Sequence, residues 1–188
     1  MRVAISGTHC CGKSTLIDQF LLTHPDFAHE PEPYEALQEE HGERFAAEPG
    51  VEDFYQQLVY HVGRLLQYGP VDRVIYERSP ADYLAYMFAL ADLGRDREAF
   101  RVVENSLVMA EEAIHLLDVV VFLPANDLHT EIPDSEDPEL RSAVDVRLEG
   151  ILIDDDLGWF ESNNPVVVKV SGTTTQRLQT VESAVEHK

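Results

Sequence analysis

Eight residues near the start of the chain, GTHCCGKS, limit its possible folds more than any other stretch. Gly7, Gly12, Lys13 and Ser14 fit the pattern G-x-x-x-x-G-K-[ST], which here follows the apolar run RVAIS and opens a helical pattern. In such a loop, backbone N–H groups and a helix N-terminus surround a phosphate, and the lysine reaches β- and γ-phosphate oxygens. The sequence therefore predicts a strand, loop and helix that bind a nucleoside triphosphate.

The residues of this loop have separate expected roles. Ser14 is expected to hold Mg²⁺ through its hydroxyl. His9 could touch a phosphate or the acceptor, although loop geometry explains it as well. The adjacent Cys10 and Cys11 are explained as small residues in a tight loop, and a redox switch on phosphate binding is the alternative. The expected nucleotide-binding set is Gly7, Thr8, His9, Cys10, Cys11, Gly12, Lys13, Ser14 and Thr15.

Along the rest of the chain, short apolar runs alternate with helical patterns. Strands are expected over residues 2–6, 26–30, 71–77, 118–124 and 165–171, and helices over 13–24, 34–44, 51–68, 81–93, 97–117, 139–154 and 176–186. The runs 118–124 and 165–171 are almost continuously apolar, which is typical of strands covered on both faces. Five strands separated by helices predict a single α/β domain, residues 1–188, with a doubly wound five-stranded parallel sheet. Ligands of such sheets bind beyond the carboxyl ends of the strands.

The charge balance narrows the expected partners. Thirty-five acidic and 14 basic side chains give a formal charge of −21. Such a surface repels polyphosphate backbones and anionic membranes unless basic residues cluster locally, so neither nucleic acid nor a membrane is expected as a partner. No signal-peptide layout is visible, and two adjacent cysteines fit a reducing compartment. We therefore expect a cytoplasmic protein, and its oligomeric state stays open.

Two further motifs end strands and carry charge. VIYERSP places Glu77 and Arg78 at the end of the third expected strand, where a carboxylate can hold the hydration shell of Mg²⁺ and a guanidinium can clamp phosphate oxygens. A surface ion pair is the alternative. HEPEPY supplies Glu30 and Glu32, either of which could accept the proton of an acceptor hydroxyl. The alternative is an acidic surface turn made by its two prolines.

Together, these motifs resemble the P-loop kinases of small metabolites, in particular the nucleoside and nucleotide kinases and the ribosylnicotinamide-kinase-like ATPase domains. GTHCCGKSTL, EPEPY, YERSP and an Arg-bearing helix before VVVKVSG occur in the order of that family. The resemblance implies transfer of the γ-phosphoryl group of ATP, with Mg²⁺, to a small acceptor, and a helical lid within residues 126–157. The residues that it implies as catalytic are Lys13, Glu32, Glu77, Arg78, Arg141 and Arg147, with Ser14 and Glu77 on the metal side.

Within that resemblance, each charged residue has an implied role. Glu32 is the acceptor-side carboxylate or base, Glu77 is the metal-side acid, and Arg78 clamps phosphate. Arg141 or Arg147 is the lid arginine. These roles are implied by the local motifs in which the residues stand.

The acceptor is encoded only weakly. Residues 53–66 resemble the helix that presents a glutamine and aromatic side chains to a base in deoxynucleoside kinases, which nominates Gln56, Gln57, Tyr60 and Arg64. An acidic acceptor pocket would favour a neutral nucleoside or a cationic ribosyl compound, whereas ordered arginines would favour a monophosphate. The second function class is a nucleotide-binding regulator or sensor that acts through a protein partner. Acceptor-stimulated turnover of ATP separates the two classes.

Overall fold

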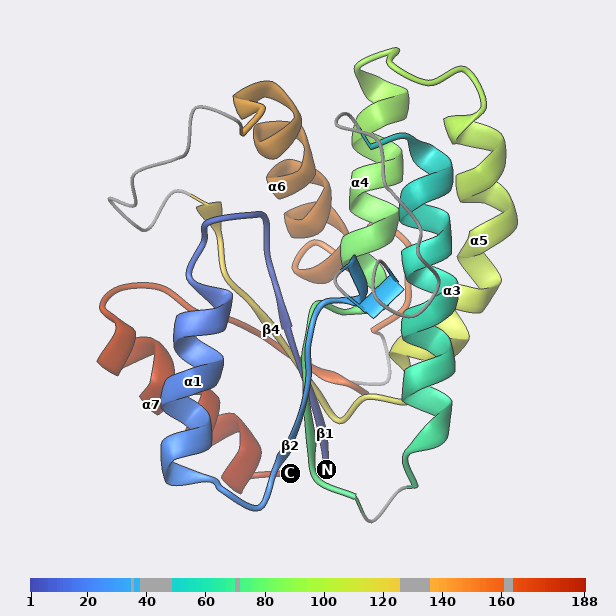
Figure 1. Cartoon of the computed structure of the whole chain (residues 1–188). Helices are drawn as coiled ribbons and strands as arrows, with labels where there is room; N and C mark the ends of the chain where they lie inside the picture. Colours follow the sequence, from blue (N-terminus) through green and yellow to red (C-terminus); the bar gives the residue numbers. More distant parts are fainter. Residues whose placement is uncertain (35, 38–48, 70–71, 126–135, 161–163) are drawn as a thin grey trace.

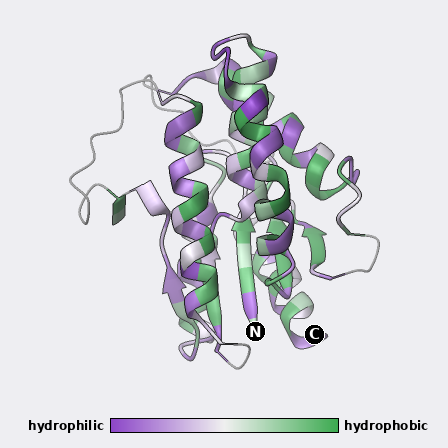
Figure 2. Cartoon of the chain, turned by 90° about the vertical axis from the view of Figure 1, so that its right-hand side faces the viewer, coloured by the Kyte–Doolittle hydropathy of each residue, from purple (hydrophilic) through white to green (hydrophobic). Residues whose placement is uncertain are grey.

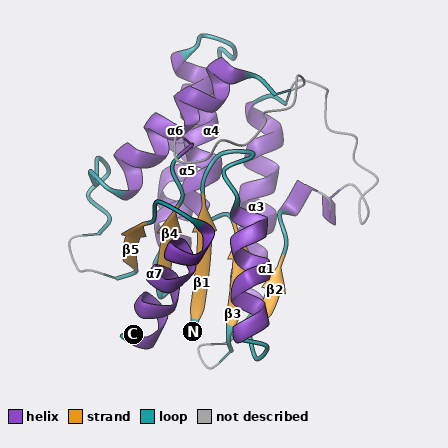
Figure 3. Cartoon of the chain, turned by 90° about the vertical axis from the view of Figure 1, so that its left-hand side faces the viewer, coloured by secondary structure: helices purple, strands orange, loops and turns teal. Residues whose placement is uncertain are grey.

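The computed structural model describes residues 1–34, 36–37, 49–69, 72–125, 136–160 and 164–188. Five strands in this part of the chain form one parallel sheet in the order β2-β3-β1-β4-β5. The strands are β1 (Arg2–Ser6), β2 (Ala28–Glu30), β3 (Val74–Glu77), β4 (Val119–Phe122) and β5 (Val166–Lys169). The predicted five-stranded parallel α/β sheet is confirmed, and Figures 1 and 3 show helices on both of its faces.

The helices form two layers of unequal size. On one face lie α1 (Lys13–Thr23) and α7 (Thr174–Glu186), and on the other lie α3 (Val51–Gln67), α4 (Pro80–Asp92), α5 (Ala99–Ile114) and α6 (Pro138–Leu152). Successive side chains of a strand point to opposite faces, so Val3 and Ile5 of β1 join the α1/α7 core while Ala4 joins the larger core. Figure 2 shows the resulting contrast between an apolar central strand and helices of mixed hydropathy.

The two apolar runs in the C-terminal half of the chain, 118–124 and 165–171, differ in burial. All four residues of β4 are fully buried, as predicted for a strand covered on both faces. In contrast, β5 is at the edge of the sheet, where β4 is its one partner among the described strands, and its residues are half-buried or exposed. The prediction that 165–171 is covered on both faces is therefore wrong, because a run of valines also suits the half-covered edge of a sheet.

Helix α4 stands at the centre of the larger core and begins at the functional end of the sheet. Ser79 is its N-cap and Pro80 its first residue, a position where the missing N–H of proline costs nothing. The loop after β1 lies at the same end, opposite the N-terminus (Figure 1). The start of α4 is therefore held next to the glycine loop.

Some predicted segments differ from the structure or fall outside it. The predicted helix 97–117 is shorter, Ala99–Ile114, and the predicted strand 26–30 begins only at Ala28. Most of the predicted helix 34–44 and residues 126–135 of the predicted lid lie outside the described residues. The described part of the lid is centred on α6, whose Val144 and Leu148 are buried in the larger core. Among the described helices, none combines the length and the apolar character that a membrane span requires.

Candidate active site

The loop after β1 has the backbone shape that its glycines permit. Gly7, Cys10 and Gly12 have φ angles of 152°, 57° and 93°, in the region that side chains disfavour. A Cβ on Gly7 would lie 2.6 Å from Cys11 Sγ and 2.7 Å from the carbonyl oxygen of Leu123. Gly12 ends the loop as the N-cap of α1, so the positive end of that helix faces the loop. Cys10 and Cys11 are free thiols, and burial raises the pKa of Cys11.

Lys13 and Ser14 stand at the first turn of α1. The Lys13 ammonium is buried and donates to the carbonyl oxygen of Thr8 at 2.9 Å, within the loop itself. The Ser14 hydroxyl donates to Glu77 Oε1 at 2.9 Å, so the structure brings together the two residues predicted on the metal side. A hydroxyl and a carboxylate are hard oxygen ligands that suit Mg²⁺. The described residues contain no cluster of three or more His, Cys, Asp or Glu side chains that could hold a metal ion by themselves.

Arg78 connects the glycine loop with Glu32. Its side chain is fully buried, and its Nε lies 2.7 Å from Glu32 Oε1. Its Nη1 donates to the Gly7 carbonyl oxygen at 3.2 Å, and its Nη2 lies 3.2 Å from Nε2 of His9. The φ angle of Arg78 is 76°, a backbone strain that clusters at functional sites.

Asp82 is a residue of the site that our sequence interpretation missed. It is fully buried on the first turn of α4, and its carboxylate accepts from the N–H of Gly7 at 2.9 Å and the N–H of Ser79 at 2.8 Å. It also lies 3.6 Å from Arg78. The signal was present as Ser79-Pro80-Ala81-Asp82, in which an N-cap serine is followed three residues later by an acid. Asp82 therefore fixes the start of the loop to the start of α4.

The structure separates the two glutamates of EPEPY. Glu30 is taken by Arg64, which donates to it from Nε at 2.8 Å and from Nη2 at 2.5 Å, and the Tyr68 hydroxyl donates to the same carboxylate. Glu32 instead lies against Arg78. Burial alone would raise the pKa of Glu32, but the positive charges of Arg78 and Lys13 hold it below its ordinary value. Of the two, Glu32 is the carboxylate beside the phosphate loop.

The two predicted lid arginines lie in different places. Arg141 donates from Nε to the His9 carbonyl oxygen at 3.0 Å and from Nη2 to that of Ala125 at 3.3 Å, so it contacts the glycine loop. Arg147 is held at the far end of α4 by Asp92, with two contacts of 2.6 Å. The described residues therefore join Arg141 to the loop and leave Arg147 apart from it.

The His9 side chain of the loop contacts Arg78. It keeps part of its surface exposed, yet its ring is crowded by Arg78 and Tyr86. Desolvation and the charge of Arg78 lower the pKa of His9 to about 4. At neutral pH the imidazole is uncharged, so its Nε2 can accept a hydrogen bond from Arg78.

A second missed residue, Arg177, supports the loop from the other side. It lies on α7 in line with the buried Val181 and Val185, and only 2% of its surface is exposed. Its Nη1 donates to the Cys11 carbonyl oxygen at 3.0 Å and its Nε to the Gly172 carbonyl oxygen at 3.1 Å. An arginine at i, i+4, i+8 spacing with two valines was the signal that could have revealed a buried cation.

The residues that we nominated on α3 differ in how deeply they are buried. Gln57 is buried, Gln56 and Tyr60 are half-buried, and Arg64 is paired with Glu30. The apolar face predicted for this helix is present, and it includes the fully buried His61, which we did not single out. Recognition of a base by α3 stays a prediction.

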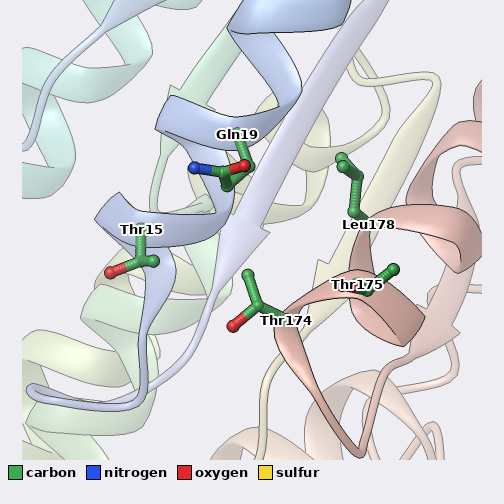
Figure 4. A pocket seen from close by; sticks show the side chains of 5 residues that line it. All are labelled: Thr15, Gln19, Thr174, Thr175 and Leu178. Carbon is green, nitrogen blue, oxygen red and sulfur yellow. The ribbon is translucent and has the colours of Figure 1, made fainter.

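A pocket of about 310 Å³ lies between α1 and α7, next to the loop. Figure 4 shows that Thr15 and Gln19 approach it from α1, and Thr174, Thr175 and Leu178 from α7. Its lining is uncharged and combines hydroxyl, amide and apolar groups. Thr15 directly follows Ser14, so this pocket continues from the phosphate loop.

The fold of the chain is similar to that of several solved structures, two of them kinases by name. A deoxyadenosine kinase from M. mycoides with dCMP and a flexible dCDP bound has a TM-score of 0.64 and 15% identity, covering 100% of both chains. The NadR protein in complex with NR has a TM-score of 0.70 and 15% identity over 99% of this chain and 50% of its own. Thymidylate kinase from Candida albicans has a TM-score of 0.60 and 13% identity over 99% of this chain and 91% of its own.

These similarities establish the fold. The chain has the α/β fold of the P-loop nucleoside and nucleotide kinases. No protein-family model matches the sequence, and no curated protein is significantly similar to it in sequence. Its activity is therefore inferred from the geometry of its own site.

Proposed function

We propose that this chain is an ATP- and Mg²⁺-dependent kinase that transfers the γ-phosphoryl group to a nucleoside or nucleotide. The observation that carries the proposal is Arg78, which contacts both the phosphate loop at Gly7 and the carboxylate of Glu32. One buried side chain thereby joins the expected donor and acceptor sites. The solved structures of similar fold include a deoxyadenosine kinase and a thymidylate kinase, which supports the same class of reaction.

The phosphates of ATP would bind to residues 7–15. Lys13 would exchange its bond to the Thr8 carbonyl for phosphate oxygens, and Arg141, which already contacts the His9 carbonyl, would add a second positive charge. Fixed positive groups of this kind stabilise the charge of the transferring phosphoryl group more than water does. The uncharged pocket that begins at Thr15 suits the base or ribose of the nucleotide.

The metal side of the site would consist of Ser14 and Glu77. Their hydroxyl and carboxylate already lie 2.9 Å apart and would hold Mg²⁺ directly or through its water shell. When bound, the metal neutralises charge on the β- and γ-phosphates.

Glu32 is the proposed base. The charge of Arg78 keeps its carboxylate ionised at neutral pH, so it can accept the proton of the acceptor hydroxyl. The hydroxyl oxygen then bonds to the γ-phosphorus, the bond from that phosphorus to the β–γ bridging oxygen breaks, and ADP leaves. Arg78 keeps its bond from Nε to Glu32, while Nη1 and Nη2, which face the loop, stabilise the charge on the transferred group. The contacts of Arg147 with Asp92 offer no support for a role in this step.

The decisive experiment measures ADP formed from Mg·ATP in the presence of nucleosides, nucleoside monophosphates and ribosylnicotinamide. Lys13→Ala is the test variant, and Lys169→Ala, which removes an edge-strand lysine paired with Glu149, is the matched control. We expect one acceptor class to stimulate turnover, the stimulated rate to fall at least about 100-fold in Lys13→Ala, and Lys169→Ala to resemble wild type. Binding of ATP with no acceptor-stimulated turnover would contradict the proposal and favour the sensor.

A further inference from the structure

The side chains around Glu32 are rich in carboxylates and in uncharged polar groups. We propose that the acceptor is a nucleoside without a phosphate, held by uncharged polar side chains of α3 and α4 beside Glu32, and that nucleoside monophosphates are excluded. This inference rests on the proposed kinase function and decides between the two acceptor classes that the function leaves open.

Among the residues that the structure describes, the two arginines on the acceptor side, Arg64 and Arg78, are already paired. Arg64 is held by both oxygens of Glu30, at 2.8 and 2.5 Å, and Arg78 is held by Glu32 at 2.7 Å with Asp82 at 3.6 Å. An acceptor phosphate would have to displace a carboxylate from one of these arginines. That exchange gains no ion pair, and it leaves a buried carboxylate without its partner, which is strongly unfavourable.

Two further cations in the described part of the chain, Lys13 and Arg141, are placed on the donor side. Lys13 and Arg141 contact carbonyl oxygens of the glycine loop, at Thr8 and His9 respectively. Both are therefore placed for the phosphates of ATP.

The balance of charge next to Arg78 is negative. Three carboxylates, those of Glu30, Glu32 and Asp82, face the two guanidiniums of Arg64 and Arg78, a formal excess of one negative charge. A phosphate dianion brought among them meets like charges in a partly buried setting, where screening by water is weak. A neutral or cationic nucleoside meets no such repulsion.

Buried polar groups beside this cluster lack a partner. Nε2 of His61 on α3 and the hydroxyl of Tyr83 on α4 have no hydrogen-bond partner among the described residues. Their rings are close together, with centroids 5.5 Å apart, and the Arg78 guanidinium lies 5.1 Å from the Tyr86 centroid. Buried polar atoms are nearly always paired in proteins, so unpaired ones beside a site indicate where a ligand supplies the missing hydrogen bonds.

These two groups and the Tyr86 hydroxyl are uncharged at neutral pH. Burial lowers the pKa of His61 to about 3, and burial raises the pKa of Tyr86 to about 12 and that of Tyr83 well above its ordinary value. They can therefore exchange hydrogen bonds with the hydroxyls, carbonyls or amines of a nucleoside, but they cannot neutralise a phosphate. Phe54, stacked on Tyr86 with centroids 4.5 Å apart, adds an aromatic surface of the kind that packs against a base.

The first test compares each nucleoside with its own 5′-monophosphate, both as acceptors with Mg·ATP and as ligands in calorimetric titration without ATP. We expect kcat/KM and affinity to favour the nucleoside by at least about tenfold. Equal or better use of the monophosphate would overturn the inference while leaving the kinase function intact. Selective binding of nucleosides without any turnover would instead refute the kinase and retain the acceptor site.

The second test weakens the proposed exclusion of nucleoside monophosphates. Glu30→Gln leaves Arg64 without its carboxylate, so we expect the preference for nucleoside over monophosphate to shrink by about tenfold. Asp26→Asn is the matched control because it frees Arg73 in the same way. Asp26 and Arg73 form an exposed ion pair, and they lie just before β2 and β3, respectively. A preference unchanged in Glu30→Gln, or reduced equally in both variants, would contradict the charge argument.

The third test removes one unpartnered hydroxyl without changing the shape of the side chain. Tyr83→Phe should raise the KM for the nucleoside about fivefold and leave the KM for ATP unchanged, because a neutral hydrogen bond is lost on the acceptor side only. Tyr76→Phe is the control: its hydroxyl is also buried and unpartnered next to His61, but it comes from β3 on the side of Glu30. Equal effects in both variants, or none in Tyr83→Phe, would show that α4 does not hold the acceptor in this way.

Discussion

The donor and acceptor halves of the candidate site are held by different means. The donor half is a run of consecutive residues, 7–15, whose shape comes from the backbone freedom of Gly7 and Gly12. The acceptor half is assembled from Glu32, Arg78 and His61, which come from separate segments and are held by side-chain contacts and packing. Arg78 bonds to the loop at Gly7, so its removal would disturb both halves. Because neither Glu32 nor His61 bonds to the loop backbone within the described part of the chain, we expect either of these side chains to be removable without altering the shape of the loop.

Among the variants that distinguish the acceptor half from the donor half, Glu32→Gln is expected to have the largest effect. Removing the proposed base while keeping the shape of the side chain should lower kcat by about 100- to 1,000-fold, because proton removal from the acceptor loses its partner. The affinity for ATP should change little, since the loop keeps its backbone shape. Steady-state kinetics and calorimetric titration with ATP check both parts.

Glu30→Gln is the matched variant for that prediction. Glu30 carries the same charge two residues earlier, but its carboxylate already accepts hydrogen bonds from Arg64 and Tyr68. We expect its kcat with the preferred nucleoside to stay within about threefold of wild type, as for groups outside the reacting geometry. A loss of kcat in Glu30→Gln as large as in Glu32→Gln would mean that the base has been assigned to the wrong glutamate.

The same contrast explains what the sequence could predict. The loop, the strand that precedes it and the α/β sheet were predictable because local rules govern them: glycine freedom, apolar runs and helical periodicity. The pairing of Ser14 with Glu77 followed from the meeting of strand ends at one edge of the sheet. Local patterns were therefore sufficient for the fold and for most of the donor half.

The acceptor half could not be predicted to the same extent. Nothing local distinguishes Glu30 from Glu32, because their difference arises from Arg64, 34 residues away from Glu30 along the chain, and from Arg78. The capping position of Asp82 could be read from the local pattern, but its bond to the Gly7 N–H, 75 positions away, could not. Long-range pairs of this kind depend on tertiary packing, which periodicity and propensity do not encode.

The next largest expected effect tests how the donor half is held. Arg177→Met leaves the carbonyl oxygens of Cys11 and Gly172 without their donor, so the free energy of unfolding should fall by about 2–3 kcal/mol. Because Cys11 belongs to the loop, the KM for ATP should rise while the KM for the acceptor stays near wild type. Thermal unfolding and kinetics with each substrate varied in turn measure the two effects.

Gln179→Met is the control on the same helix. Gln179 is exposed on α7, so an equally apolar replacement there should leave stability within about 0.5 kcal/mol of wild type. A rise in acceptor KM in Arg177→Met would contradict the separation of the halves.

The acceptor half should also confer a pH dependence on stability. The pKa of His61 is about 3 in the folded chain and about 6.5 when unfolded, so below pH 6.5 the unfolded chain binds a proton that the folded chain does not. Stability should therefore fall as pH decreases from 6.5 toward 3, and one such group costs about 2 kcal/mol by pH 5. Urea unfolding at pH 7 and pH 5 measures it. His61→Phe should reduce this loss and Tyr83→Phe should not; equal losses in His61→Phe and wild type would contradict burial of a neutral imidazole.

The smallest expected effect concerns the two predicted lid arginines. Arg147→Ala removes an ion pair with Asp92 and the packing of its guanidinium over Phe88, which are partly exposed contacts at the far end of α4. Such pairs contribute about 0–1 kcal/mol, so stability should change by no more than that and kcat/KM by less than about twofold. Arg141→Ala, in contrast, removes a cation bonded to the His9 carbonyl and should raise the KM for ATP severalfold. The contrary outcome is that Arg147→Ala impairs ATP turnover. In that case α6 would have to release Asp92 and move Arg147 toward the loop during the reaction. The donor half would then include Arg147 as well as residues 7–15 and Arg141.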